Sequence, residues 1–179
     1  MRRARVLKLD VVGEPSPPKS GHYNSERNRT QGQWQQASAN IVQCPAVALG
    51  RLSSAVCYQD AKAAFRWLEE AFGFEPLFVL LDAEGNLGHS EMTYGNSVVV
   101  VGNEWSDAHK SPKSIGGKNS QSIHVQLAEG EDLDAHCERA RAAGAEVLME
   151  PEMQFYGDRT YRARDPEGHI WTFSVTVKK

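Results

Sequence analysis

Two ionisable residues that stand two positions apart, His89 and Glu91, are the first candidates for chemistry in this 179-residue chain. They lie in a stretch with strand-like alternation, so both side chains would project from one face of the strand. An imidazole beside a carboxylate can pass a proton, and we therefore take the pair as candidate catalytic residues acting as acid and base. A structural pair, or a pair within a dimer interface, explains the same spacing, and that alternative stays open.

Arginines occupy a second predicted strand near the C-terminus. By alternation Arg162 and Arg164 share one face, and Tyr161 takes the other. A guanidinium that faces a cavity suits a carboxylate or phosphate group of a ligand, which makes Arg159 and Arg162 candidate ligand-binding residues. Pairing with an aspartate of the same hairpin is the structural alternative.

Two aromatic residues are further candidates for ligand binding. Tyr156 precedes the arginine-rich strand, and Trp105 lies in a segment, 104–120, that is rich in Gly, Ser and Lys. We expect both rings to wall a pocket, with Trp105 carried by a linker or lid.

The composition excludes several classes of protein. Apolar residues make up 40% of the chain and charged residues 24%, and the net charge is −3. These values are ordinary for a globular protein and give no basic field for nucleic acid. The longest apolar run, Leu77–Leu81, is far shorter than the roughly 20 residues of a membrane span. We expect no nucleic-acid or membrane partner, and the odd number of three cysteines favours a cytoplasmic protein.

The first 50 residues differ from the rest of the chain. They hold 7 Lys and Arg against 3 Asp and Glu, and residues 13–40 are dominated by polar residues, Gly and Pro. Such a stretch buries too little apolar surface to offset the entropy of ordering it. We therefore expect 1–50 to be a partly disordered N-terminal extension.

The remainder contains one pattern of elements twice. In the first copy, 51–103, a strand is followed by a helix that ends at Gly73 and then by three strands. In the second copy, 121–179, the same order recurs with a helix that ends at Gly144. The predicted strands are 52–58, 74–81, 86–94, 96–101, 122–128, 145–150, 159–164 and 169–177, and the predicted helices are 60–72 and 132–143. The fold class is α+β, built from two βαβββ modules.

Two stretches, YQDAKAAFRWLEEAFGFE (58–75) and YGDRTYRARDPEGHIWTFS (156–174), resemble the vicinal oxygen chelate superfamily, in its glyoxalase, bleomycin resistance protein and dioxygenase branch. The resemblance covers about 51–177. It implies mixed, curved sheets that form a concave cavity. We also expect a homodimer, since one module forms a half-open sheet and members of the family complete the cavity either within one chain or by exchange between two. A monomer whose two modules close on each other is the alternative.

The resemblance also indicates where a metal would bind. Members with a metal take one ligand from the first strand and one from the last strand of each module. Counting from the repeated glycines places these positions at Ser53, Val99, His124 and Thr172. Of these only His124 is a strong ligand for a divalent cation, and a catalytic cation generally needs about three. We therefore expect no cofactor, although a mistaken register would leave a divalent metal possible.

The same alternation assigns the core. The residues expected beneath the helices, against Phe65, Leu68 and Phe72, are Val98, Val100, Trp171, Phe173 and Val175. The opposite face is expected to form the ligand cavity. Its predicted lining consists of Ser53, His124, Thr172, His89, Glu91 and at least one of Arg159 and Arg162.

The sequence thus favours a metal-independent protein that binds or sequesters a small organic ligand. A metal-dependent lyase, isomerase or dioxygenase of the same superfamily is the alternative. A metal-free enzyme that uses His89, Glu91 or His124 as its base also stays open.

Overall fold

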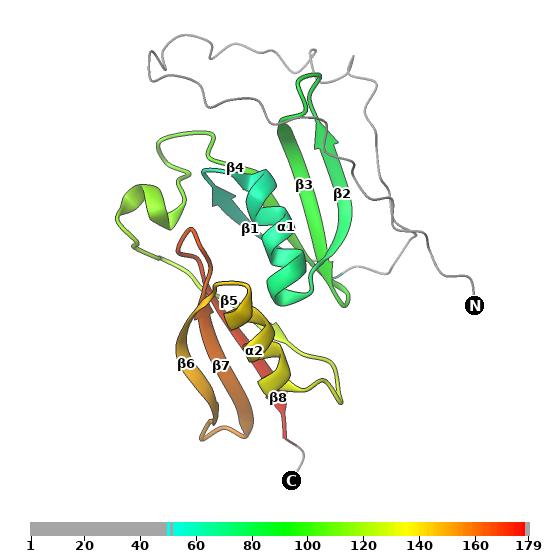
Figure 1. Cartoon of the computed structure of the whole chain (residues 1–179), viewed down its shortest axis with the longest axis vertical. Coiled ribbons are helices and arrows are strands. Elements are labelled where there is room, and N and C mark those ends of the chain that lie inside the picture. The colour runs from blue at the N-terminus through cyan, green and yellow to red at the C-terminus, as the bar shows by residue number, and fades with distance from the viewer. Residues whose placement is uncertain (1–49, 51, 178–179) are drawn as a thin grey trace, which may run out of the picture.

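The computed structural model describes Gly50 and residues 52–177, so the predicted extension lies almost wholly outside the described residues. Within that part the chain forms two modules with the same order of elements (Figure 1). The first module contains β1 (Ser53–Tyr58), α1 (Ala61–Phe72), β2 (Glu75–Leu81), β3 (Leu87–Tyr94) and β4 (Ser97–Asn103). The second contains β5 (Ile123–Gln126), α2 (Leu133–Ala142), β6 (Glu146–Met153), β7 (Asp158–Arg164) and β8 (Ile170–Thr176), and a short 3-10 helix, η2 (Pro112–Ile115), lies between the modules.

Each module folds its four strands into one mixed sheet. The strand orders are β1-β4-β3-β2 and β5-β8-β7-β6. The first strand of each module runs parallel to the last, and the other neighbours are antiparallel. The prediction of an α+β fold with two βαβββ modules is therefore confirmed.

Local capping defines where the helices begin and end. The Asp60 carboxylate accepts a hydrogen bond from the backbone N–H of Ala63 at 2.9 Å, and Asp132 caps α2 in the same way. The helix α1 ends at Gly73, whose φ of 77° is a left-handed conformation that favours glycine.

Each sheet has a helix face, which packs under its helix, and an outer face on the opposite side. In the second sheet Trp171 and Phe173 are fully buried on the helix face, as the alternation predicts. In the first sheet the prediction is wrong by one residue. Val99 and Val101 are buried on the helix face, whereas Val98 and Val100 lie on the outer face in register with Ser53 and Ala55.

The error has a physical cause in the length of the turns. The pair Tyr94 and Ser97 closes a two-residue turn between β3 and β4. The pair Arg164 and Ile170 closes a five-residue turn between β7 and β8. The fourth residue after the turn glycine is therefore Val99 on the helix face of β4 but Thr172 on the outer face of β8.

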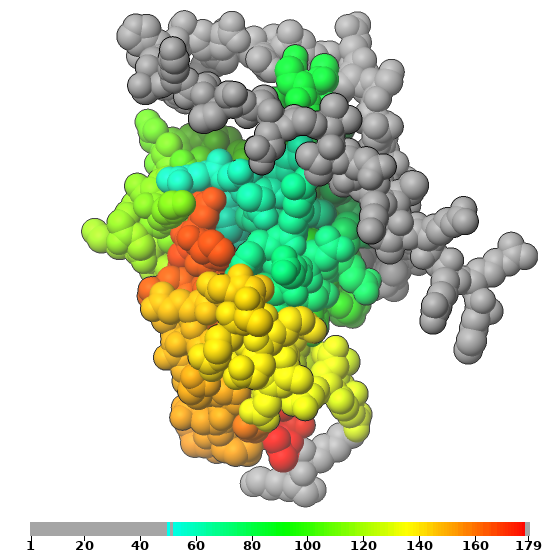
Figure 2. Space-filling view, viewed as in Figure 1, coloured from blue at the N-terminus to red at the C-terminus, as the bar shows by residue number. Residues whose placement is uncertain are grey.

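The two modules pack against each other through their helix faces. Phe72 of α1 lies 5.5 Å from the ring of Trp171 and 4.7 Å from that of Phe173, and Phe74 lies 5.4 Å from Trp171. The helices α1 and α2 lie next to each other where the modules meet (Figure 1). In the space-filling view the surfaces of the two modules adjoin there (Figure 2). The outer faces of the two sheets consequently point away from this shared core.

Hydrogen bonds hold the segment 104–120 against the second module. The backbone N–H of Lys113 donates to the carbonyl oxygen of Glu167 at 2.9 Å, and the Asn119 side chain donates to that of Gly168 at 2.8 Å. The segment therefore contacts the turn between β7 and β8. Within the described part of the chain, no helix has the length and apolar content to cross a bilayer.

Candidate functional site

A cavity of about 1030 Å³ lies where the two modules meet. Its wall is formed by the start of β1 and β4, the end of α1, the turn between β3 and β4, and the strand β5. The lining includes apolar Phe74, Val98, Val99 and Ile123, and polar Ser53, Thr93, Tyr94, His124, Gln126, Glu131 and Arg139. Residues from both modules therefore share one cavity.

Ser53 and His124 lie in this wall, as the sequence leads us to expect. Each comes from the edge strand of its sheet, β1 or β5. Both are exposed and lie on the outer faces, since Ser53 pairs with Val98 and His124 pairs with Thr172. The cavity therefore continues onto the outer faces at the two sheet edges.

A chain of hydrogen bonds fixes the His124 ring. The Ser174 hydroxyl donates to Gln126 Oε1 at 2.7 Å, so its oxygen accepts from His124 Nε2 at 2.7 Å. Neutral His124 then carries its proton on Nε2, and Nδ1 is an acceptor with no partner among the described residues. The arrangement leaves one ring nitrogen for a ligand.

Three polar residues form a row across the outer face of the second sheet. His124 on β5, Thr172 on β8 and Arg162 on β7 are direct neighbours in register. Arg162 Nε donates to Thr172 Oγ1 at 3.3 Å. Of this row only His124 lines the cavity, and Thr172 and Arg162 extend from it over the sheet.

The candidate catalytic pair lies on the outer face of the first sheet. His89 Nε2 and Glu91 Oε1 are 2.9 Å apart, so the two side chains do meet as their spacing indicates. The ring of Phe78 lies 5.9 Å from that of His89. The pair does not line the cavity, so the prediction of a single lining that includes both His89 and His124 fails within one chain.

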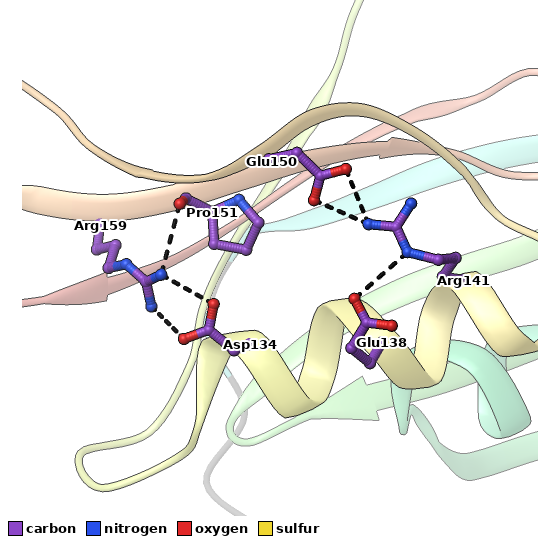
Figure 3. Close-up of polar contacts among 6 residues, drawn as sticks. All are labelled: Asp134, Glu138, Arg141, Glu150, Pro151 and Arg159. Atoms are coloured by element: carbon purple, nitrogen blue, oxygen red, sulfur yellow. Dashed lines mark hydrogen bonds and ion pairs between the residues drawn. The ribbon is translucent and has the colours of Figure 1, made fainter.

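Arg159 lies on the helix face of the second sheet, away from the cavity. Its guanidinium donates to both carboxylate oxygens of Asp134 on α2, and also to the carbonyl oxygen of Pro151 (Figure 3). These bonds hold the pKa of Asp134 below its usual range. The expectation that Arg159 faces the cavity is not met, because it alternates in phase with Tyr161, which is buried in the core.

The two aromatic candidates also lie outside the cavity lining. Trp105 is 71% exposed and stacks on His109, with ring centroids 4.0 Å apart. Tyr156 is 56% exposed beside Phe155 in the turn between β6 and β7. Neither ring walls the pocket in this chain.

With the register corrected, the four positions that would chelate a metal are Ser53, Val98, His124 and Thr172. Val98 replaces Val99 in this set, and neither residue offers a ligand atom. No group of three or more His, Cys, Asp or Glu residues suited to a metal occurs in the described ranges. A neutral hydroxyl pair with one imidazole does not fit a catalytic divalent cation.

Sequence reasoning missed Gln126 and Ser174, which hold His124 in place. Each stands two residues from a predicted site residue, Gln126 from His124 and Ser174 from Thr172. The strand period of two, which predicts that His124 and Thr172 share one face, also predicts that Gln126 and Ser174 lie on that face.

Comparison with known proteins identifies the family to which this chain belongs. The profile of the Glyoxalase/Bleomycin resistance protein/Dioxygenase superfamily matches residues 49–173. The chain belongs to this superfamily. A curated relative in Mycobacterium tuberculosis, the uncharacterized protein Rv0887c, is 29% identical over 132 residues, which cover 72% of this chain and 75% of the relative.

Three solved structures show the same fold. TioX from Micromonospora sp. ML1 is 29% identical and superposes with a TM-score of 0.58, over 72% of this chain and 99% of TioX. TnmS3 from Streptomyces sp. CB03234, described as an antibiotic binding protein, is 19% identical with a TM-score of 0.55, over 74% of this chain and all of TnmS3. A superfamily member from Sphaerobacter thermophilus is also 19% identical with a TM-score of 0.55, over 73% of this chain and 98% of its own.

Proposed function

We propose that this protein binds a small organic molecule at the module junction and does so without a metal ion. The observation that carries the proposal is the composition of the four chelate positions. They supply one imidazole, two hydroxyls and an aliphatic side chain beside a cavity of about 1030 Å³. These groups can form hydrogen bonds to a ligand but cannot hold a catalytic cation.

The cavity suits a ligand with an apolar body and one polar end. Phe74, Val98 and Ile123 offer apolar surface, while Ser53 and His124 place hydrogen-bonding groups at the sheet edges. The volume is at the upper end of the range of small-molecule pockets, roughly 300–1000 Å³. TnmS3, which has this fold, is described as an antibiotic binding protein. The ligand we propose here is likewise a small organic molecule of a size that fits the cavity.

We also propose that two copies of the chain complete the site. The helix faces are buried against each other within one chain, whereas the outer faces carry half-buried apolar residues such as Phe78 and Val100. A second copy that places its second sheet over the first sheet of its partner would cover these residues. Such an exchange would bring the His89–Glu91 pair opposite the row of His124, Thr172 and Arg162, which one chain holds apart.

The proposed location is the cytoplasm. Cys57 and Cys137 are free thiols, as is usual in a reducing compartment. Burial raises the pKa of both thiols, Glu104 adds to this effect at Cys57, and neither thiol is therefore activated as a nucleophile.

Ligand screening by thermal shift tests the proposal. Chelator-treated protein is screened with aromatic cationic drugs, aromatic anions and small α-keto acids, and a ligand that binds the cavity raises the melting temperature. The variant His124→Ala should weaken binding of every hit and leave the melting temperature of the free protein nearly unchanged, because the ring is exposed. His109→Ala, at an exposed histidine outside the cavity, is the matched control. Binding that the His124 variant keeps in full would contradict the proposed site.

A further inference from the structure

Among the described residues no carboxylate pairs with Arg162, in contrast to Arg141 and the other arginines of β7. Arg141 donates to Glu150 at 2.8 and 2.9 Å, and Arg159 pairs with Asp134 (Figure 3). Arg164 donates to Glu146 at 2.8 Å. Within the described residues, the one hydrogen bond of the Arg162 side chain is that from Nε to Thr172. Its terminal N–H groups are therefore available on an exposed surface.

Thr172 adds a second unused donor beside this guanidinium. The residue is 7% exposed, and its oxygen accepts from Arg162. In the described part of the chain no acceptor takes its hydroxyl hydrogen. A guanidinium fork beside an O–H donor matches the geometry of a carboxylate, sulfonate or phosphate group.

The position of these donors relates them to the cavity. Arg162 and His124 lie on either side of Thr172, so their backbones are two strand spacings apart, about 10 Å. His124 lines the cavity and Arg162 lies at the far end of the row. A bicyclic or tricyclic aromatic body spans such a distance.

Two carboxylates of β6 stand on the same face as this row, and both have hydrogen-bond partners. Glu146 pairs with Arg164, and Glu152 on the same face accepts a hydrogen bond from Gln154. Met149 is the cross-strand neighbour of Arg162 on β6 and carries no charge. Within one chain, a negative group brought by a ligand would therefore meet a guanidinium that no carboxylate of the described residues pairs with.

We infer that Arg162 and Thr172 bind the anionic oxygen-bearing group of a ligand whose apolar body lies toward the cavity. The inference rests on the proposed function and specifies its ligand class: an aromatic or polycyclic organic acid. It assigns Arg162 as the residue that selects an acid over its neutral analogue.

Two fluorescent probes that share one aromatic framework test this selection. 8-Anilinonaphthalene-1-sulfonate carries a sulfonate, and N-phenyl-1-naphthylamine has the same rings without it. Arg162→Ala should weaken binding of the sulfonate about tenfold or more, as expected for a lost charge-assisted hydrogen bond, and change binding of the neutral probe less than about twofold. Arg164→Ala removes an identical charge from the same face, but from a guanidinium already paired with Glu146, and should leave both affinities unchanged.

The outcomes separate this inference from the proposed function. If wild-type protein binds both probes and Arg162→Ala binds the sulfonate as tightly as wild type does, the inference is overturned while the proposed function stands. An equal loss of affinity for both probes also overturns it, because Arg162 would then maintain the structure of the site and not recognise the negative charge of the sulfonate. If neither probe binds to wild-type protein, the proposed function and the inference fail together. Melting temperatures of all variants establish that each is folded.

Discussion

His136 on α2 and Phe72 at the end of α1 are joined by a hydrogen bond between the modules. The imidazole Nε2 donates to the backbone carbonyl oxygen of Phe72 at 3.0 Å, while Nδ1 accepts from the Tyr161 hydroxyl at 2.6 Å. Neutral imidazole satisfies both bonds at once. Burial, reinforced by the nearby Arg139 charge, lowers the pKa of His136 from 6.5 to about 4.

This pKa shift predicts a loss of stability in mild acid. The unfolded chain binds a proton at His136 near pH 6.5, whereas the folded chain does so only near pH 4. Stability is therefore fully present above pH 6.5 and falls as the pH is lowered toward 4, by up to about 3 kcal/mol. Urea unfolding at a series of pH values should show this decline in wild-type protein and a flatter profile in His136→Gln.

The exposed His109 provides the control for that experiment. His109→Gln should retain the full wild-type pH dependence, because its ring is not buried. A His136→Gln profile parallel to that of wild type would contradict the assignment of the acid sensitivity to this buried imidazole.

A second link between the modules centres on Asp165. Its carboxylate accepts from the Tyr58 hydroxyl at 2.7 Å and the Trp171 indole at 3.1 Å, and also from the backbone N–H groups of Glu167 and His169. Asp165→Ala would leave these buried donors without an acceptor, and we expect the free energy of unfolding to fall by about 3 kcal/mol or more.

The Tyr58 hydroxyl can be removed without disturbing the rest of this cluster. Tyr58→Phe should lower the free energy of unfolding by about 1–2 kcal/mol in urea titrations. Tyr156→Phe, at an exposed ring, should have no measurable effect. Equal stabilities of the two variants would show that the bond between Tyr58 and Asp165 is not stabilising.

The glycine that ends α1 is predicted to be required. Gly73 has a φ of +77°, and a Cβ there would lie 2.9 Å from Arg139 Nη2. Gly73→Ala should cost about 1–2 kcal/mol of unfolding free energy, from the left-handed backbone and the displaced side chain. Gly102→Ala is the control, because a Cβ added there would meet no atom within 4 Å and the φ of Gly102 is not positive. The prediction fails if both variants unfold at the same urea concentration.

The proposed second copy predicts the mass of the protein in solution. Sedimentation equilibrium at micromolar concentration should give twice the 19.8 kDa of one chain. Val100→Glu places a charge on the outer face of the first sheet and should shift the protein toward the single-chain mass while it stays folded. Arg66→Glu, at an exposed position of α1, should not. A wild-type mass of one chain would rule out the dimer.

Much of the fold follows from local patterns in the sequence. Apolar spacing, the capping residue Asp60 and the terminal glycine Gly73 define α1 within one residue, and the repeat of this arrangement reveals the second module. The contact between His89 and Glu91 follows from a strand period of two. These features depend on residues close in the chain, which is why sequence reasoning captures them.

The parts that could not be predicted depend on turn geometry and on contacts between distant elements. The glycines Gly95 and Gly168 look equivalent in sequence, yet the turn that contains Gly95 has two residues and the turn that contains Gly168 has five. For this reason Val98 lies on the outer face and not on the helix face that the sequence predicts. The contact between Phe72 and Trp171 is part of the interface that joins the helix faces of the two modules. Nothing local in either residue specifies that partner, and so the separation of His89 from His124 emerged only from the fold.

Probe binding measured with and without metal tests whether the protein binds its ligand independently of a metal ion. Protein purified without chelators is analysed for Ni, Zn, Fe and Mn, and its affinity for N-phenyl-1-naphthylamine is measured before and after chelation and after each metal is restored. We expect substoichiometric metal and the same affinity in every state, because Ser53, Val98, His124 and Thr172 cannot hold a cation. One tightly bound metal per chain, together with probe binding that chelation abolishes and the metal restores, would contradict metal-independent binding.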